Sequence, residues 1–275
     1  MVENNKYFVF YIFFFFIIMN NVFYILIIFL VFYILNQFIF QENFENSINY
    51  QTYVINLDRS KDRLKNITKE MNDAHLSFIR WNAFDGSKLN FNKLIQKNIL
   101  NEKNKMMVGA IGCSMSHISL WKEAIKHKKN ILVFEDDIKI PRDFSKKLTV
   151  YLNQLPSKWD ILYLGASNIN GKKYSSNLLI PNIMPNSNST HNTGMYAMLI
   201  HYNFLQKLIE NNLPISGNID QSIKNKLFQT SNIFICNPPL INHDNTQPSM
   251  RRIVSNKPST TKWFSHVQNK IIITN

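Results

Sequence analysis

The chain is predicted to form an α/β domain with a mainly parallel central sheet covered by helices. Short apolar segments of strand character alternate with segments of helical periodicity, and residues 131–134 have the uniformly apolar composition of a buried strand. Strands separated by helices favour parallel pairing, because a parallel connection needs a crossover that is usually a helix. A chain of 275 residues fits one such domain behind a separate N-terminal segment.

The expected elements follow in order along the chain. Strands are expected where β-branched and aromatic residues cluster, at residues 52–57, 78–81, 131–134, 159–164 and 194–200. Helices are expected where apolar residues recur at helical spacing, at residues 60–72, 114–127 and 202–211. Ser60 is a plausible N-cap of the first helix. Ile118, Trp121 and Ile125 share one face of the second helix.

The N-terminal segment is expected to be a membrane anchor spanning residues 7–40. Residues 7–19 and 22–35 are apolar or aromatic, and a membrane-spanning helix needs about 20 mostly apolar residues. A cleaved signal peptide is the alternative, but its cleavage site needs small residues. Residues 7–46 contain no Ala, Ser or Gly, so an uncleaved signal-anchor is favoured.

Charges flanking this segment predict its orientation. Lys6 precedes the span, and Glu42 and Glu45 follow it, so the positive-inside tendency places residues 1–6 in the cytosol as a short tail. The chain is therefore expected to be a single-pass type II membrane protein whose main domain is lumenal, in the endoplasmic reticulum or Golgi, or otherwise non-cytosolic. The remaining boundaries are a stalk at 41–50, the main domain at 51–245 and a basic C-terminal tail at 246–275.

Composition excludes several classes of protein. The apolar content of 45% is too high for a disordered chain, and two cysteines are too few for a disulfide framework or a four-cysteine zinc module. The formal net charge of +13 would attract an anionic ligand. Solubility, or attraction to anionic head groups beside a membrane anchor, would explain the same charge.

Three consecutive carboxylates follow the buried strand at residues 131–134. In extended chain Glu135 and Asp137 would share one face, with Asp136 on the opposite face. Ligands bind at the carboxyl ends of strands in open α/β sheets, and two hard oxygen ligands on one face suit Mg²⁺ or Mn²⁺ bridging a diphosphate. A solvated acidic turn at the end of the strand is the alternative.

A glycine-containing segment precedes the helix expected at 114–127. Gly109 and Gly112 would allow close backbone approach to a ligand, and the helix start would favour an anion. The alternative is an ordinary loop leading into a capped helix, with His117 as a core or surface histidine.

Four blocks together resemble glycosyltransferase family 25, which comprises lipopolysaccharide-type and procollagen galactosyltransferases. Their order and spacing match the family, and two further segments, at residues 159–165 and 193–197, are also similar to it. The blocks are residues 53–64, residues 80–86, residues 109–117 with Trp121 beyond them, and residues 132–137.

The resemblance implies a GT-A-like fold, a UDP-sugar donor, Mn²⁺ or Mg²⁺, and inversion at the sugar carbon. The acidic triplet would stand in place of an Asp-x-Asp motif, with Asp137 as a metal ligand and Glu135 as a ribose or metal contact. The sugar would be galactose or glucose, and the acceptor a hydroxyl of a glycan, a hydroxylysine or a lipid-linked sugar. Residues expected near the donor are Asn56, Asp58, Arg59, Arg63, Asp85, Gly112, His117, Glu135 and Asp136. Arg63 could equally lie on a helix surface.

The catalytic base and the last metal ligand are expected in the C-terminal part of the domain. An inverting transfer needs a carboxylate that takes the proton of the acceptor hydroxyl. By resemblance this base is Asp220, with Asp244 in reserve; a helix N-cap is the alternative for Asp220. His243 could complete the metal site, or could be a loop histidine with no partner.

Two rival functions remain open from the residues. A metal-dependent nuclease could use Asp137-x-Lys139, but the anchor and the extra carboxylates argue against it, and no nucleic acid partner is expected. A non-catalytic sugar-binding or interaction protein is the second rival, although all three acids are present.

Overall fold

The computed structural model describes residues 24, 26–34, 48–103, 106–182 and 191–244, and the chain divides into two units after Ile48. In the first unit, residues 26–34 are helical and expose apolar side chains. Within these described ranges no helix combines the length and apolar character that crossing a membrane requires. Most of the predicted anchor at 7–40, the tail at 1–6, most of the stalk and the tail at 246–275 lie outside the described residues. Anchoring, orientation and location therefore stay predictions.

The second unit contains an eight-stranded sheet in the order β2-β1-β3-β8-β5-β9-β7-β6. Parallel pairs join β1 to β2, β1 to β3 and β5 to β9. Antiparallel pairs join β8 to β3 and β5, and β7 to β9 and β6, so β7 and β8 run against the other strands of this sheet. The strands are β1 (Tyr50–Asn56), β2 (Ile79–Asn82), β3 (Asn130–Glu135), β5 (Ile161–Tyr163), β6 (Gly171–Lys173), β7 (Leu178–Pro181), β8 (Ala197–Ile200) and β9 (Ile233–Cys236).

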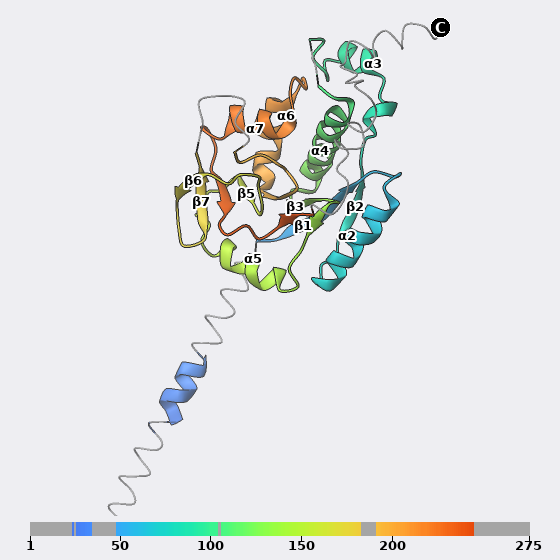
Figure 1. Cartoon of the computed structure of the whole chain (residues 1–275). Helices are drawn as coiled ribbons and strands as arrows, with labels where there is room; N and C mark the ends of the chain where they lie inside the picture. The colour runs from blue at the N-terminus through green and yellow to red at the C-terminus, as the bar shows by residue number, and fades with distance from the viewer. Residues whose placement is uncertain (1–23, 25, 35–47, 104–105, 183–190, 245–275) are drawn as a thin grey trace, which may run out of the picture. The chain divides into compact units, whose positions relative to one another are not determined.

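Helices cover both faces of the sheet, which confirms the predicted α/β architecture with a mainly parallel centre (Figure 1). Helices α4, α6 and α7 lie on one face, and α2 and α5 on the other. The helices are α2 (Lys61–Asp73), α3 (Phe91–Gln96), α4 (Val108–His127), α5 (Phe144–Leu152), α6 (Leu205–Asn212) and α7 (Ile219–Leu227), with short 3-10 turns η1 (Gly86–Lys88) and η2 (Tyr202–Phe204).

Strand alternation divides the apolar side chains between the two faces. Tyr53 and Ile55 of β1 belong to the buried cluster that also holds residues of α4, α6 and α7. On the other face Phe134 of β3 meets Phe144 of α5 edge to face, with ring centroids 5.9 Å apart. Both faces are therefore apolar, as expected for a sheet with helices on either side.

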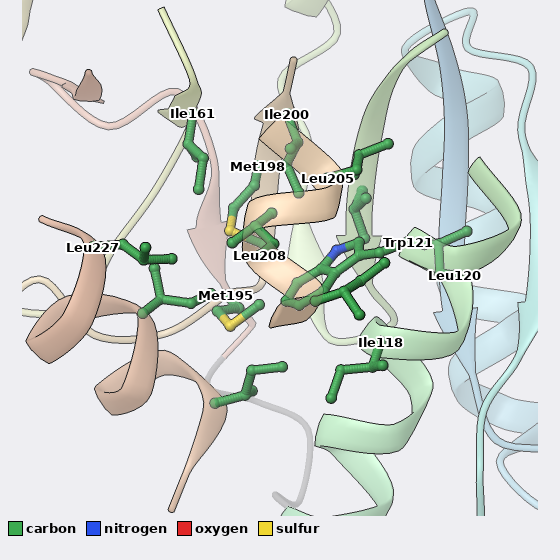
Figure 2. Packing of buried hydrophobic residues seen from close by; sticks show 14 of the residues in the cluster. Ile118, Leu120, Trp121, Ile161, Met195, Met198, Ile200, Leu205, Leu208 and Leu227 are labelled. Atoms are coloured by element: carbon green, nitrogen blue, oxygen red, sulfur yellow. The ribbon is translucent and has the colours of Figure 1, made fainter. Parts of the chain in front are cut away.

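The larger cluster is centred on contacts between α4 and α6. Figure 2 shows Trp121 of α4 near Leu205 and Leu208 of α6, with Met198 of β8 next to Leu208. All four side chains are buried. Burial of a side chain of this size stabilises a fold by about 1.5–3 kcal/mol, so this layer fixes α4 firmly against the sheet.

Helix α4 begins earlier than predicted, and the prediction of a loop before residue 114 was wrong. The helix starts at Val108, so Gly109 and Gly112 lie inside it rather than before it. Glycine disfavours a helix interior, but a Cβ on Gly112 would lie 2.6 Å from the carbonyl oxygen of Phe84. The close approach that Gly112 allows is thus to the backbone that precedes η1.

Other local expectations differ in smaller ways. Ser60 occupies the N-cap position of α2 but makes no side-chain capping bond. Strands β6, β7 and β9 and helices α3, α5 and α7 were not predicted, because each has ten residues or fewer and gives little periodic signal.

Candidate active site

Polar residues from three neighbouring strands meet at one edge of the sheet. Strands β2, β1 and β3 are adjacent and parallel, so their carboxyl ends lie together. The chain leaves β1 through Asp58 and Arg59, β2 through residues 83–85, and β3 through Asp136 and Asp137. Segments far apart in sequence therefore contribute acidic and basic groups to one region.

Arg63 of α2 joins two of the three consecutive acids. Its Nη1 lies 2.8 Å from Oδ1 of Asp136 and 3.0 Å from Oδ2 of Asp137, and the side chain is only 15% exposed. Arg63 is therefore not a helix-surface residue. The expectation that Asp136 points away from Asp137 was wrong, because β3 ends at Glu135 and the chain bends there, which ends the strand alternation.

The side chain of Asn56 forms a hydrogen bond with the carboxylate of Asp136. Its Nδ2 donates to Oδ2 of Asp136 at 2.6 Å, and its Oδ1 accepts from Nε of Arg80 at 3.0 Å. Burial raises the pKa of Asp136, and hydrogen bonds from Asn56 and Arg63 partly offset that rise. Both carboxylate oxygens are thus engaged, so Asn56 and Asp136 are suited to positioning Arg63.

Asp137 faces His243, which comes from much later in the chain. Strand β10 (Asn242–His243) pairs antiparallel with β4 (Ile138–Lys139) and brings Nε2 of His243 to 3.4 Å from Oδ2 of Asp137. The ring of Tyr196 packs edge to face on His243, with centroids 5.9 Å apart. The structure therefore gives His243 a partner, against the alternative of an isolated loop histidine.

The donor set around Asp137 fits a hard divalent cation. Among the described residues Oδ1 of Asp137 is buried and has no hydrogen-bond partner. Burial, followed by the negative charge of Glu135, raises the pKa of Asp137 to about 6, against the opposing effects of Arg63 and His243. A carboxylate of this pKa is mostly ionised at neutral pH, and carboxylate and imidazole are suitable ligands for Mn²⁺.

Glu135 is directed toward helix α4. Its Oε1 lies 3.4 Å from Nε2 of His117 and 4.0 Å from Sγ of Cys113. His117 is completely buried, whereas the Glu135 side chain is 30% exposed. His117 was expected near the donor, and its contact toward this edge of the sheet is with Glu135.

A pocket of about 430 Å³ adjoins the ends of β1 and β2. Across it Arg59 forms an ion pair with Asp85, whose Oδ1 also accepts from the Ser87 backbone at 3.1 Å. The lining consists of Leu57, Asp58, Arg59, Asn82, Ala83, Phe84, Asp85, Lys88 and Leu89. Three residues expected near a nucleotide, Asp58, Arg59 and Asp85, therefore line one cavity.

The two acids in this pocket stay ionised at neutral pH. Hydrogen bonds from Arg80 and Asn82 lower the pKa of Asp58. Partial burial acts to raise the pKa of Asp85, but hydrogen bonds from Arg59 and Ser87 leave it below its ordinary value. Ionised carboxylates accept hydrogen bonds only, which suits hydroxyl or amino groups of a ligand.

The two candidate bases have different surroundings. Asp220 lies in the first turn of α7 and accepts backbone N–H groups of Gly194 at 3.2 Å and Gln221 at 2.8 Å. Asn218 occupies the N-cap position, so the N-cap alternative for Asp220 was wrong. Asp244 is only 3% exposed and pairs with Lys139 at 3.3 Å, which makes it a poor acceptor of a substrate proton.

Sequence reasoning overlooked Arg80, Cys113 and Tyr196 as members of this region. Arg80 had a detectable signal, because it and Asn82 are polar residues two apart in a short strand and so share a face. Cys113 also had one, since it lies one helical turn before His117. Tyr196 had none, because its packing on His243 depends on the tertiary fold.

The raised pKa of Asp137 predicts how stability changes with pH. Its pKa is about 6 in the folded chain, above the ordinary value of 3.8, so the contribution of this group is complete at low pH and is lost as pH rises through about 6. Asp137→Asn cannot ionise and should become more stable than the parent chain over this interval. Urea unfolding of both proteins in chelator, from about pH 4 to about pH 8, measures the difference. A difference that moves toward the parent as pH rises would contradict the assignment.

Comparison with known proteins shows which family the chain belongs to. The model of "Glycosyltransferase family 25 (LPS biosynthesis protein)" matches residues 49–223. The chain belongs to glycosyltransferase family 25. The match covers most of the second unit. It includes Arg63, Glu135, Asp136 and Asp137, which with His243 and Asp244 form what we call the acidic rim, but it stops before His243 and Asp244.

Individual family 25 relatives are distant in sequence. Human procollagen galactosyltransferase 2 is 26% identical over 58% of this chain, and the procollagen lysyl hydroxylase and glycosyltransferase of Acanthamoeba polyphaga mimivirus is 27% identical over 78%. The human inactive glycosyltransferase 25 family member 3 is 26% identical over 45%. The chain spans about a quarter of each of these relatives, 27%, 26% and 23% respectively.

Proposed function

We propose that this family 25 chain is a metal-dependent inverting glycosyltransferase that moves a hexose from a UDP-sugar to a hydroxyl group. The observation that carries the proposal is the convergence of Asp137, His243 and Arg63 at the rim beside the 430 Å³ pocket. A carboxylate with an unpartnered buried oxygen next to an imidazole suits a divalent cation, and the pocket suits a nucleoside.

Donor binding uses the pocket and the rim together. Asp58 and Asp85 accept hydrogen bonds from hydroxyl or amino groups of the nucleoside. Arg59 and Lys88 neutralise negative charge on the donor's phosphates. Asp137 and His243, with Glu135 as the third candidate ligand, would hold Mn²⁺ or Mg²⁺, which neutralises charge on the departing diphosphate. Arg63 keeps Asp137 in place through its shared contact with Asp136.

The transfer itself is a single displacement. The acceptor oxygen forms a bond to the anomeric carbon while the bond from that carbon to the diphosphate oxygen breaks, so configuration inverts and UDP leaves. The proton of the acceptor hydroxyl passes to the carboxylate of Asp220. Two backbone N–H groups orient that carboxylate, and one of them belongs to Gly194, two residues before the Tyr196 ring on His243.

The names of the relatives guide the choice of substrates. The name of human procollagen galactosyltransferase 2 supports galactose rather than glucose as the sugar transferred by this chain. The acceptor is proposed to be a hydroxyl of a glycan or of a hydroxylysine. A nuclease is disfavoured because Lys139 pairs with Glu70 at 3.1 Å and with Asp244, rather than with Asp137. A non-catalytic role is the other alternative, because several similar proteins, among them the human family member 3, are described as inactive or probably inactive. All three consecutive acids are present in this chain.

The test is a donor panel with the full chain. UDP-galactose, UDP-glucose and other UDP-sugars are incubated with Mn²⁺ or with chelator, with and without galactosyl-hydroxylysine and hydroxylysine acceptors, and free UDP is measured. Metal-dependent release of UDP from one donor supports the proposal. Donor binding without metal-dependent turnover would favour the non-catalytic protein, and DNA cleavage without UDP release would favour the nuclease.

A further inference from the structure

A second group of metal-ligating side chains lies where the end of β3 meets helix α4. Cys113 and His117 stand one turn apart on α4, so they share a face of the helix, and Glu135 approaches them from the end of β3. One ligand atom from each residue lies within 4.8 Å of the other two. We propose that Cys113, His117 and Glu135 bind a zinc-class divalent cation, separate from the cation of the donor site.

The distances are close to those of a tetrahedral zinc site. Zinc bonds of about 2.0–2.3 Å at tetrahedral angles separate the ligand atoms by about 3.3–3.8 Å. Nε2 of His117 lies 3.4 Å from Oε1 of Glu135, and Sγ of Cys113 lies 4.0 Å from the same oxygen. A side-chain adjustment of about 0.5 Å at Cys113 would therefore bring its Sγ to a coordinating separation from Oε1 of Glu135.

The buried imidazole is the second observation that points to a ligand. His117 is fully buried, and among the described residues its Nδ1 has no hydrogen-bond partner. Its contact with Glu135, at 3.4 Å, is longer than an ordinary N–H···O bond of 2.7–3.2 Å. A cation on Nε2 would replace this long contact with a short bond, and Nδ1 would then carry the proton of the neutral ring.

The ligand types separate this site from the donor site. A thiolate and an imidazole select zinc or a similar transition metal, whereas Asp137 offers the hard oxygen that suits Mn²⁺ or Mg²⁺. Binding releases the thiol proton of Cys113 to solvent. The fourth position would hold water, entering beside the Glu135 side chain, which is 30% exposed.

Cobalt substitution of the full chain tests the proposal directly. Metal-free protein with excess Mg²⁺ is titrated with Co²⁺, and a thiolate-to-cobalt charge-transfer band at one equivalent is expected. Zn²⁺ should displace it. Cys113→Ser and Cys113→Ala should abolish the band and weaken Zn²⁺ binding by about 100-fold, the upper end of what loss of even an outer-shell partner costs. Circular dichroism of both variants verifies that they fold.

Two control variants make the result specific to this cluster. Cys236→Ala removes the other thiol, which is buried in β9 and not bonded to Cys113, and it should retain the band. Asp137→Asn should also retain the band, because it alters only the donor site. Absence of the band in the parent chain, its survival in the Cys113 variants, or its loss in Asp137→Asn would each overturn the proposal. The donor panel measures UDP release and the cobalt titration measures the thiolate band. Failure of one proposal can therefore be distinguished from failure of the other.

Discussion

Asp137→Asn is expected to lower the rate of sugar transfer by roughly 10²–10³-fold or more, the loss seen when one electrostatic contact to a developing negative charge is removed. The amide keeps the size and shape of the carboxylate but not its charge. It therefore cannot hold a cation together with His243, whose Nε2 lies 3.4 Å from the carboxylate. Transfer is measured as UDP release at saturating Mn²⁺.

Unfolding would not explain this loss. The pKa of Asp137 is raised in the folded chain, so its ionised form carries a free-energy cost that asparagine lacks. The variant should consequently be at least as stable as the parent chain at neutral pH while being inactive. Asp143→Asn is the matched control, because Asp143 is exposed and pairs with Lys147 in the next turn of α5. Parent-like transfer by Asp137→Asn would remove Asp137 from the proposed site.

Gly112→Ala is expected to destabilise the fold by about 1–3 kcal/mol, the usual cost of adding a methyl group to a filled interior. The added Cβ would lie 2.6 Å from the carbonyl oxygen of Phe84 and 2.8 Å from the backbone nitrogen of Gly86. Both neighbours are backbone atoms, which cannot rotate away as a side chain would. Helix α4 would have to move away from η1.

Gly109→Ala is the control for this substitution. It lies one turn earlier in the same helix, and a Cβ there meets nothing within 4 Å. Alanine is favoured over glycine in helices by about 0.5–1 kcal/mol, so this change should be neutral or stabilising. Urea unfolding of both variants and the parent measures the contrast. Equal stability of the two variants would show that the contact between α4 and η1 is not tight.

Most of the sheet could be predicted from the sequence because its strands are apolar and β-rich. The strand at residues 131–134 and the helix through Ile118 and Trp121 have strong patterns, and the structure confirms both. The start of α4 could not be predicted, because glycine usually ends or precedes helices. Its tolerance at position 112 depends on the backbone of Phe84, which lies far away in sequence.

Some site residues could likewise be predicted from the sequence, whereas others depend on the tertiary fold. The position of the acidic triplet at the sheet edge could be predicted because the triplet comes directly after a buried strand. Parallel pairing of β1, β2 and β3 brings Asp58, Asp85 and Asp136 to that edge. The alternation rule failed at Asp136 because the strand ends one residue earlier. The choice for Arg63 between a place near the donor and the helix surface needed the direction of its side chain, which helical periodicity does not give.

The short pairing of β4 with β10 has a consequence for how the protein matures. The ribosome makes β4 about a hundred residues before His243, so the nascent domain can form its acidic rim long before the imidazole exists. A chain stalled or clipped between β9 and residue 242 would retain all eight strands of the main sheet yet lack this partner of Asp137. The contact between Asp137 and His243 can therefore form only after residue 243 has been synthesised.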